Sequence, residues 1–449
     1  MALLKLFKLS KKYTIDLSPP TVLAIGFLLL MAIGTLVLKL PFATRESISW
    51  VEALFTAASA VTVTGLAVVD TGSVFTPFGQ LTITALVQAG GLGFVTFAVI
   101  AAMSLSARLG IGQKAFAQEA LGQTSLAKVS HVAKAVFVYS LFFELLGWLL
   151  LTLAWQPQLG WRDASYYGLF HSVAAFNNAG FALFPDSMSS FVGHTWISLI
   201  ISGLYIVGGI GFVVLMDIRQ KRRWHQLQSN TKIILSATLL INLLAFVLIW
   251  ILESSNPATL APLAAKEQAL AAWFQATVPR SSGFNSIQTG EMTDASTVLT
   301  LLLMFIGGGS LSTAGGIKLG TFVVLLLATR AFLRRHDEVR VFNRSIGQPQ
   351  VMKALAVTSI TLMMIFLGIF LITAIERDAD FLDVAFEVVS AVCTVGLSRG
   401  LTAELSPFSQ FLLIFMMFAG RLGPLTLAYF IATPHKSRIK YPSTHIQIG

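Results

Sequence analysis

The chain has 449 residues, of which 55% are hydrophobic and only 12% are charged, and its mean hydropathy is +0.76. Soluble proteins carry about twice that charge fraction, so the composition excludes a soluble globular protein and predicts a polytopic membrane protein. The net charge of +10 does not indicate nucleic-acid binding, because the basic residues lie in short clusters between apolar runs, and the single cysteine excludes an intramolecular disulfide.

Eight apolar runs are each long enough to cross a membrane as a helix, which takes roughly 20 residues. Four shorter, moderately apolar runs lie between the members of each successive pair, and we predict that these are re-entrant helices. The first long run follows lysines, as in a signal peptide, but it exceeds an h-region and lacks an A-x-A site, so we interpret it as a spanning helix. The long runs are 21–40, 79–105, 131–154, 195–218, 231–252, 296–329, 351–374 and 406–431, and the short runs are 50–61, 164–176, 268–278 and 381–393.

Lysine and arginine residues predict the orientation, because cytoplasmic loops are enriched in them. Five segments (1–20, 106–134, 217–232, 330–353 and 432–449) hold 22 of the 31 basic residues and five acids, whereas the alternate loops hold 15 of the 21 acids. Both termini are therefore expected in the cytoplasm, and all four re-entrant helices are expected to enter from outside.

The short runs and the residues after them can be stacked on one another. They read EALFTAASAVTVTGL (52–66), YGLFHSVAAFNNAGF (167–181), AAWFQATVPRSSGF (271–284) and DVAFEVVSAVCTVGL (383–397). An aromatic residue precedes a glycine by ten positions in each, and the glycines, Gly65, Gly180, Gly283 and Gly396, are 115, 103 and 113 residues apart. The period is one helix–re-entrant–helix unit that crosses the membrane twice, so parallel copies are related by an axis along the membrane normal.

We therefore predict an all-α polytopic membrane protein with eight transmembrane helices in four parallel helix–pore loop–helix repeats around a central pore. The repeats are expected at 21–105, 131–218, 231–329 and 351–431, between a cytoplasmic N-terminal segment 1–20 and a cytoplasmic C-terminal tail 432–449. The four segments after the short helices are 62–66, 177–181, 279–284 and 394–397.

These segments have the features of an ion filter. Non-helical backbone is tolerated at membrane depth only where it is buried in protein or lines a watery cavity. Rings of carbonyl oxygens can replace the hydration shell of an alkali ion, glycine permits the necessary backbone conformations, and helix C-termini favour a cation. The predicted filter residues are Val63, Thr64, Gly65, Asn178, Ala179, Gly180, Ser281, Ser282, Gly283, Thr394, Val395 and Gly396. The alternative, four tight turns with glycine as a helix cap, explains one such segment better than four in register.

The elements SAVTVTGL, AFNNAGF, PRSSGFN and CTVGLSRG, with QAGGLGF, VGGIGF and AGRLGP in the second helices, resemble the Trk/Ktr/HKT potassium transporters over essentially the whole chain. The membrane subunit of bacterial Ktr systems is the most similar type. The resemblance implies potassium uptake through a homodimer in the bacterial plasma membrane, with one pore per subunit. It also implies a cytosolic ring of nucleotide-binding regulatory subunits and, in many members, a sodium dependence. Some sodium-carrying relatives have serine at the first filter glycine, so Gly65 favours potassium.

The stretch IGGGSLSTAGGIK (306–318) interrupts the sixth long run with glycines and hydroxyl residues. A close-packing interface of small residues is one interpretation. In the family that the chain resembles, this region is an intramembrane loop below the filter that acts as a gate. The gate residues that the resemblance implies are Gly307, Gly308, Gly309, Ser310, Ser312, Thr313, Gly315 and Gly316.

Three charged residues within apolar runs require a polar environment. Arg421 lies about 15 residues into the last crossing and should face water or an acid. We interpret it as a positive charge below the filter. The alternative is a snorkelling residue or a residue of the dimer interface. Lys318 could reach the cytoplasmic interface. A cation aimed into a cation filter would oppose its function, so Arg280 is expected behind the filter, paired with an acid (Glu267, Glu291 or Glu387).

Two further polar side chains are interpreted as structural: Glu144 as an interhelical hydrogen-bond partner rather than an ion or proton site, and His171 as a packing residue. A membrane enzyme is disfavoured, because H-E-x-x-H, G-x-S-x-G and paired intramembrane aspartates do not occur. A sodium or ammonium carrier on the same fold remains the nearer alternative. The sequence also lacks a Walker A motif and a nucleotide fingerprint, so no organic cofactor is expected, and nucleotide control has to come from a partner docked on 217–232 and 330–353.

Overall fold

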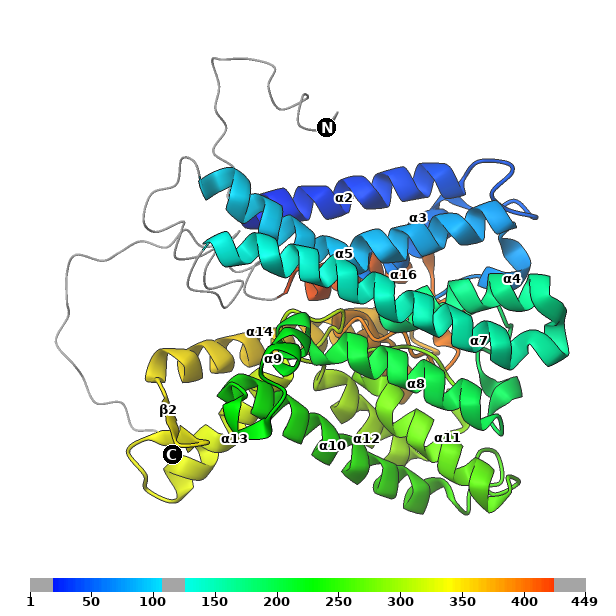
Figure 1. Ribbon diagram of the computed structural model, residues 1–449. Coiled ribbons are helices and arrows are strands. Elements are labelled where there is room, and N and C mark those ends of the chain that lie inside the picture. Colours follow the sequence, from blue (N-terminus) through cyan, green and yellow to red (C-terminus); the bar gives the residue numbers. More distant parts are fainter. Residues whose placement is uncertain (1–18, 107–125, 424–449) are drawn as a thin grey trace, which may run out of the picture.

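The computed structural model describes residues 19–106 and 126–423, and the predictions for 1–18, 107–125 and 424–449 lie outside the described residues (Figure 1). The described part is helical apart from one antiparallel hairpin of two short strands, β1 (Val339–Val341) and β2 (Arg344–Ile346). The helices are α2 (Pro19–Leu38), α3 (Trp50–Thr62), α4 (Thr71–Val74), α5 (Pro77–Ser106), α7 (Leu126–Phe176), α8 (Thr195–Ile210), α9 (Phe212–Lys221), α10 (Ser229–Glu253), α11 (Ala265–Thr277), α12 (Asp294–Phe305), α13 (Leu319–Leu333), α14 (Gln348–Ile375), α15 (Phe381–Val392) and α16 (Pro407–Leu422).

Long apolar helices identify a multi-pass membrane protein. Within the described residues, four helices are long and apolar enough to cross a bilayer, namely Thr21–Leu38, Lys134–Phe176, Ser229–Glu253 and Gln348–Ile375, and a fifth span results if the bent pair α8 and α9 counts as one. Their outer faces carry large apolar side chains, such as Leu240 on α10 and Phe366 on α14, which are 68% and 70% exposed. Such a face is stable against lipid and not against water.

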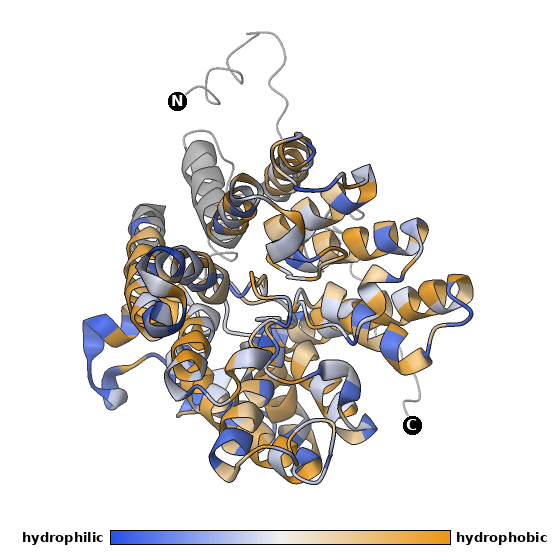
Figure 2. Cartoon of the chain, turned by 90° about the vertical axis from the view of Figure 1, so that its right-hand side faces the viewer, coloured by the Kyte–Doolittle hydropathy of each residue, from blue (hydrophilic) through white to orange (hydrophobic). Residues whose placement is uncertain are grey.

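Four short helices lie inside this outer layer: α3, the part of α7 after a kink, α11 and α15. The kink lies at Gly160, where φ is 74°. A capping box between Ser49 and Glu52 starts α3, and the Asp380 side chain caps α15. Helices α3 and α15 are buried almost throughout their length, because the other elements surround them. Figure 2 views the molecule from the end where α4 lies. The non-helical segments that come after the four short helices meet there near the centre of the ring of helices.

Two of the predicted spans are broken. The run at 195–218 is not one straight helix, because α8 and α9 meet at an angle of 91° at Gly211, whose φ is 107°. The sixth run is divided, as its composition indicates, into α12 and α13 with the loop 306–318 between them.

Hydrogen bonds to two carboxyl groups connect α14 to α16 and α10 to α12. The Glu376 carboxyl follows α14 and accepts hydrogen bonds from the backbone and hydroxyl of Ser406 and the hydroxyl of Ser409 at the start of α16. Burial raises the pKa of Glu376, but these bonds outweigh burial, so the pKa lies below its usual value. Glu253 accepts bonds from Thr293 and so connects α10 to α12 in the same way.

Candidate functional site

Each of the four central segments has two residues in the left-handed region at the same spacing. Glycine occupies the second position, at Gly65 (φ 95°), Gly180 (66°), Gly283 (72°) and Gly396 (93°). The first position, two residues earlier, holds Val63 (57°), Asn178 (62°), Ser281 (124°) and Thr394 (47°). Positive φ is uncommon outside glycine, so its recurrence at four equivalent positions indicates one imposed backbone conformation.

The four glycines form a closed ring. Each faces the carbonyl oxygen of the residue that precedes the next glycine of the ring, so closely that a Cβ atom would collide with it. The distances from an ideal Cβ to that oxygen are 2.2 Å at Gly65 (Ala179), 2.8 Å at Gly180 (Ser282), 2.6 Å at Gly283 (Val395) and 2.0 Å at Gly396 (Thr64). Glycine is therefore required here both by φ and by the approach of neighbouring backbone.

Hydrogen bonds to a serine fix the first and fourth segments in the same way. The N–H groups of Gly65 and Gly396 each donate to a serine hydroxyl six residues earlier, Ser59 and Ser390, at 3.0 Å. The third segment differs, because a 3₁₀ turn containing Pro279 replaces the end of the helix. The ring is thus built from similar but unequal segments.

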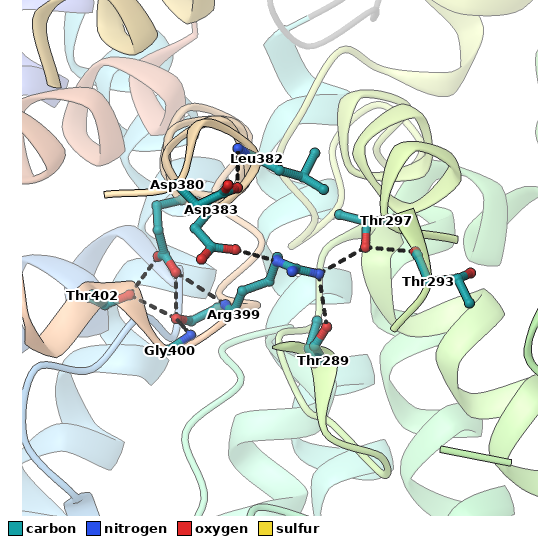
Figure 3. A network of polar contacts seen from close by, with 11 residues as sticks. Thr289, Thr293, Thr297, Asp380, Leu382, Asp383, Arg399, Gly400 and Thr402 are labelled. Atoms are coloured by element: carbon teal, nitrogen blue, oxygen red, sulfur yellow. Dashed lines mark hydrogen bonds and ion pairs between the residues drawn. The ribbon is translucent and has the colours of Figure 1, made fainter. Parts of the chain in front are cut away.

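A cavity of about 450 Å³ opens on one side of the ring and is lined by all four glycines. Asp70 and Glu291 line it and form no salt bridge with any described residue, whereas Arg399 is paired. Its guanidinium contacts Asp383 of α15 at 2.5 Å and donates to Thr297 of α12 at 2.9 Å (Figure 3). Because the arginine charge is compensated, the unpaired charges that the described residues place at the cavity wall are those of Asp70 and Glu291.

The loop 306–318 lies against the other side of the ring and fills the break between α8 and α9. Gly309 N–H donates to the Gly209 carbonyl at 2.8 Å, and Phe212 N–H donates to the Leu311 carbonyl at 3.0 Å. The break exposes backbone groups that α-helical bonds would otherwise satisfy, and the loop supplies their partners. At Gly211 a Cβ would lie 2.5 Å from the Ser310 oxygen, so the bend and the loop require each other.

Two cations hold consecutive carbonyls of this loop. Arg421 is buried and donates to the Thr313 carbonyl at 2.7 Å and to the Gly90 carbonyl of α5 at 3.3 Å. Lys318 donates to the Ala314 carbonyl at 2.6 Å. The expectation that Lys318 could reach the cytoplasmic interface is not met, because its ammonium group lies against the loop.

The prediction that Arg280 pairs with an acidic residue is wrong. Its guanidinium donates to the Asn242 side chain at 2.9 Å and to the Gly307 carbonyl at 3.1 Å, and none of the salt bridges between described residues includes it. An amide and a backbone carbonyl replace the carboxylate, so Arg280 connects the third segment to the start of the loop.

The two polar residues interpreted as structural have that environment. Glu144 accepts hydrogen bonds from Gln88 of α5 at 3.0 Å and from Asn177 at 3.1 Å, which confirms an interhelical hydrogen-bond partner. His171 is fully buried among aromatic rings, and its Nε2 accepts from the Leu183 N–H at 3.2 Å.

Side-chain ligands for a metal do not gather in the part of the chain that the structure describes: no three or more His, Cys, Asp or Glu residues are placed to hold an ion. The ring instead offers backbone carbonyl oxygens, which are suited to a weakly held alkali ion. Sequence reasoning missed the bend at Gly211, the hydrogen bond that Asn178 donates to Thr313 of the loop, and the one that Ser281 accepts from Gly315 of the loop. VGGIGF gave no usable signal for the bend, because the similar QAGGLGF stays helical within α5.

Comparison with known proteins gives a consistent result. Residues 3–441 match the family model described as "TrkH: Cation transport protein". The chain is 48% identical to the Ktr system potassium uptake protein B of Bacillus subtilis, over 96% of this chain and 97% of that protein. It is 42% identical to the protein of the same name from Vibrio alginolyticus (96% and 95% covered) and 32% identical to the potassium/sodium uptake protein NtpJ of Enterococcus hirae (98% and 99% covered). The crystal structure of the potassium transporter TrkH from Vibrio parahaemolyticus has the same fold, with a TM-score of 0.74 at 20% identity over 94% of this chain and 87% of that one.

Proposed function

The chain belongs to the TrkH family of cation transport proteins, and on that premise we propose that it takes up potassium ions through the ring of four glycines. The observation that carries the proposal is the closed ring itself, in which glycine, left-handed backbone and a close approach to the carbonyl of a neighbouring segment recur in four segments. Two relatives at 48% and 42% identity are named as potassium uptake proteins, which supports potassium as the ion. The named relatives are transporters, which supports a transporter rather than an enzyme.

We propose eight crossings in four parallel repeats at 21–105, 131–218, 231–329 and 351–431, each with a short helix ending at the ring. In this arrangement the cavity with Asp70 and Glu291 faces the outside and concentrates cations. The segments 62–66, 177–181, 279–284 and 394–397 form the filter. Both termini then lie on the cytoplasmic side of the bacterial plasma membrane.

The loop 306–318 is the proposed gate, because it contacts the ring from the side opposite to the cavity. The names of two relatives refer to a Ktr system, which supports further components. We propose a homodimer controlled by a cytosolic ring of nucleotide-binding subunits that docks on the basic segments 217–232 and 330–353. Sodium dependence is supported by the name of the relative NtpJ, and sodium transport itself is the alternative function.

Rubidium uptake into potassium-transport-deficient cells tests the proposed function. Cells that produce the chain with a regulatory subunit should accumulate rubidium, excess potassium should compete with it, and equal sodium should not. Omitting sodium and omitting the subunit, each separately, measures their contributions. Saturable uptake of sodium with no competition by potassium would establish the alternative instead.

Arg421→Ala should raise the maximal rate of uptake more than it changes the apparent potassium affinity. A unit charge roughly 10 Å from the ion path raises the barrier by about 1–2 kcal/mol at an effective dielectric constant of about 20, so we expect an increase of about tenfold. Arg421→Lys keeps the charge but cannot make both of the hydrogen bonds to Thr313 and Gly90. If the lysine variant is as fast as the alanine variant, the hydrogen bonds from Arg421 to Thr313 and Gly90, and not its charge, limit the rate. Loss of assembly on native gels, with no gain in rate, would favour the dimer-interface interpretation.

A further inference from the structure

Two filter segments hold the loop through their own side chains. The Asn178 amide donates to the hydroxyl of Thr313 at 2.7 Å, and the same hydroxyl donates to the Phe176 carbonyl at 3.2 Å. The hydroxyl of Ser281 accepts from the Gly315 N–H at 2.8 Å. The side chains of Asn178, Thr313 and Ser281 are almost completely buried, at 2% exposure or less.

Breaking these bonds has a cost on both sides. The amide of Asn178 would keep only a long contact of 3.4 Å to the Phe176 carbonyl. The hydroxyl of Ser281 would lose the Gly315 N–H that it contacts. A buried polar group without a partner is strongly unfavourable, so displacement of the loop forces these side chains to rearrange or to become hydrated.

Asn178 and Ser281 also have backbone conformations that need support from their surroundings. Both have positive φ, 62° and 124°, which a residue with a side chain adopts only when its surroundings hold it. Ala179 and Ser282, which follow them, contribute two of the four carbonyls of the ring. The loop therefore stabilises the conformation that places those carbonyls.

We propose that Asn178 and Ser281 are positioning residues that couple ion binding in the ring to the position of the loop. This inference rests on the proposed function. An ion in the ring favours the conformation in which both side chains meet the loop, and a displaced loop weakens ion binding. The coupling is reciprocal, as linkage requires. A gate that lowers ion affinity as it opens also speeds release of the ion, because conduction needs binding weak enough to let the ion leave.

The coupling is confined to two of the four segments. Val63 occupies the position equivalent to Asn178 and has no side-chain donor, and the Thr394 hydroxyl has no hydrogen-bond partner among the described residues. Side-chain hydrogen bonds thus join the loop to the second and third segments, whereas Gly315 packs against Thr394 and the Cys393 carbonyl of the fourth segment without such a bond.

Hydrogen–deuterium exchange of the purified full-length protein tests this inference without measuring transport. Peptides covering 306–319 are followed in potassium chloride and in choline chloride at equal ionic strength. Potassium should slow their exchange by about threefold to tenfold, the effect of one net hydrogen bond. Thr313→Val and Ser281→Ala should each remove most of that difference. Ser286→Ala is the matched control, because this serine is also buried near the third segment but its hydroxyl has no hydrogen-bond partner among the described residues. The potassium effect should persist in this variant.

A parallel measurement of thermal stability separates the possible results. If potassium raises the melting temperature but leaves loop exchange unchanged, or if both variants keep the full potassium effect on exchange, the coupling is refuted while the filter stands. If potassium changes neither quantity in the wild type, both the coupling and the proposed function fail. Two variants on opposite sides of the contact guard against misfolding of either one, and size-exclusion profiles identify such a case.

Discussion

Gly396→Ser should lower the apparent potassium affinity by about tenfold or more and weaken discrimination against sodium. A left-handed conformation costs a residue with a side chain roughly 1–2 kcal/mol, and about 1.4 kcal/mol corresponds to a tenfold change. The new Cβ would also lie 2.0 Å from the Thr64 oxygen and 3.0 Å from the Gly65 Cα, which are backbone atoms of the ring itself. The ring can accept the side chain only by widening.

The four glycines should differ in a defined order. The collision with the neighbouring carbonyl is severe at Gly396 and Gly65 (2.0 and 2.2 Å) and milder at Gly283 and Gly180 (2.6 and 2.8 Å), so the loss of affinity should decrease in that order. Gly203→Ser is the control, because Gly203 lies on α8 with nothing within 4 Å of its Cβ position. Rubidium uptake with potassium and sodium as competitors measures the effect. Unchanged kinetics in all four variants at normal expression would show that the ring is not the filter.

The sequence predicted the elements that depend on local patterns. The short helices α3, α11 and α15 lie within a few residues of the apolar runs that indicated them, and the glycines aligned by a ten-residue spacing meet in one ring. Glycine and hydroxyl residues in the sixth run correctly indicated an interruption, because such a composition cannot form a stable helix face against lipid.

Features that depend on partners distant in the sequence could not be predicted. QAGGLGF and VGGIGF have nearly the same composition, yet the first remains helical within α5 and the second bends at Gly211. The equivalent glycines Gly90 and Gly208 both pack against a carbonyl, of Val61 and Phe176, so they do not explain the difference. The bend lies instead where Gly211 meets the Ser310 carbonyl of the loop. Arg280 has the same explanation, since its partners Asn242 and Gly307 are 38 and 27 residues away and neither is charged.

Deleting 308–314 should raise the flux and make it largely independent of the regulatory partner. The ends of the deleted stretch lie close together, since a Cβ at Gly307 would lie 1.9 Å from the Gly315 oxygen. It removes Thr313 and with it the contacts to Asn178 and Arg421. The ring glycines are untouched, so potassium should still be preferred over sodium.

The apparent potassium affinity of this deletion variant should fall, because Asn178 loses its partner Thr313 in the loop. A partner protein can shift the loop only by binding its two arrangements with different affinity, so a variant without the loop offers it nothing to act on. Replacing 308–314 by a Gly–Ser linker of equal length is the control: it restores the bulk of the loop but none of its side-chain contacts. If the linker restores the block, bulk alone closes the path. If it does not, the hydrogen bonds are required. A deletion variant that assembles normally and still needs its partner for rubidium uptake would exclude 306–318 as the gate.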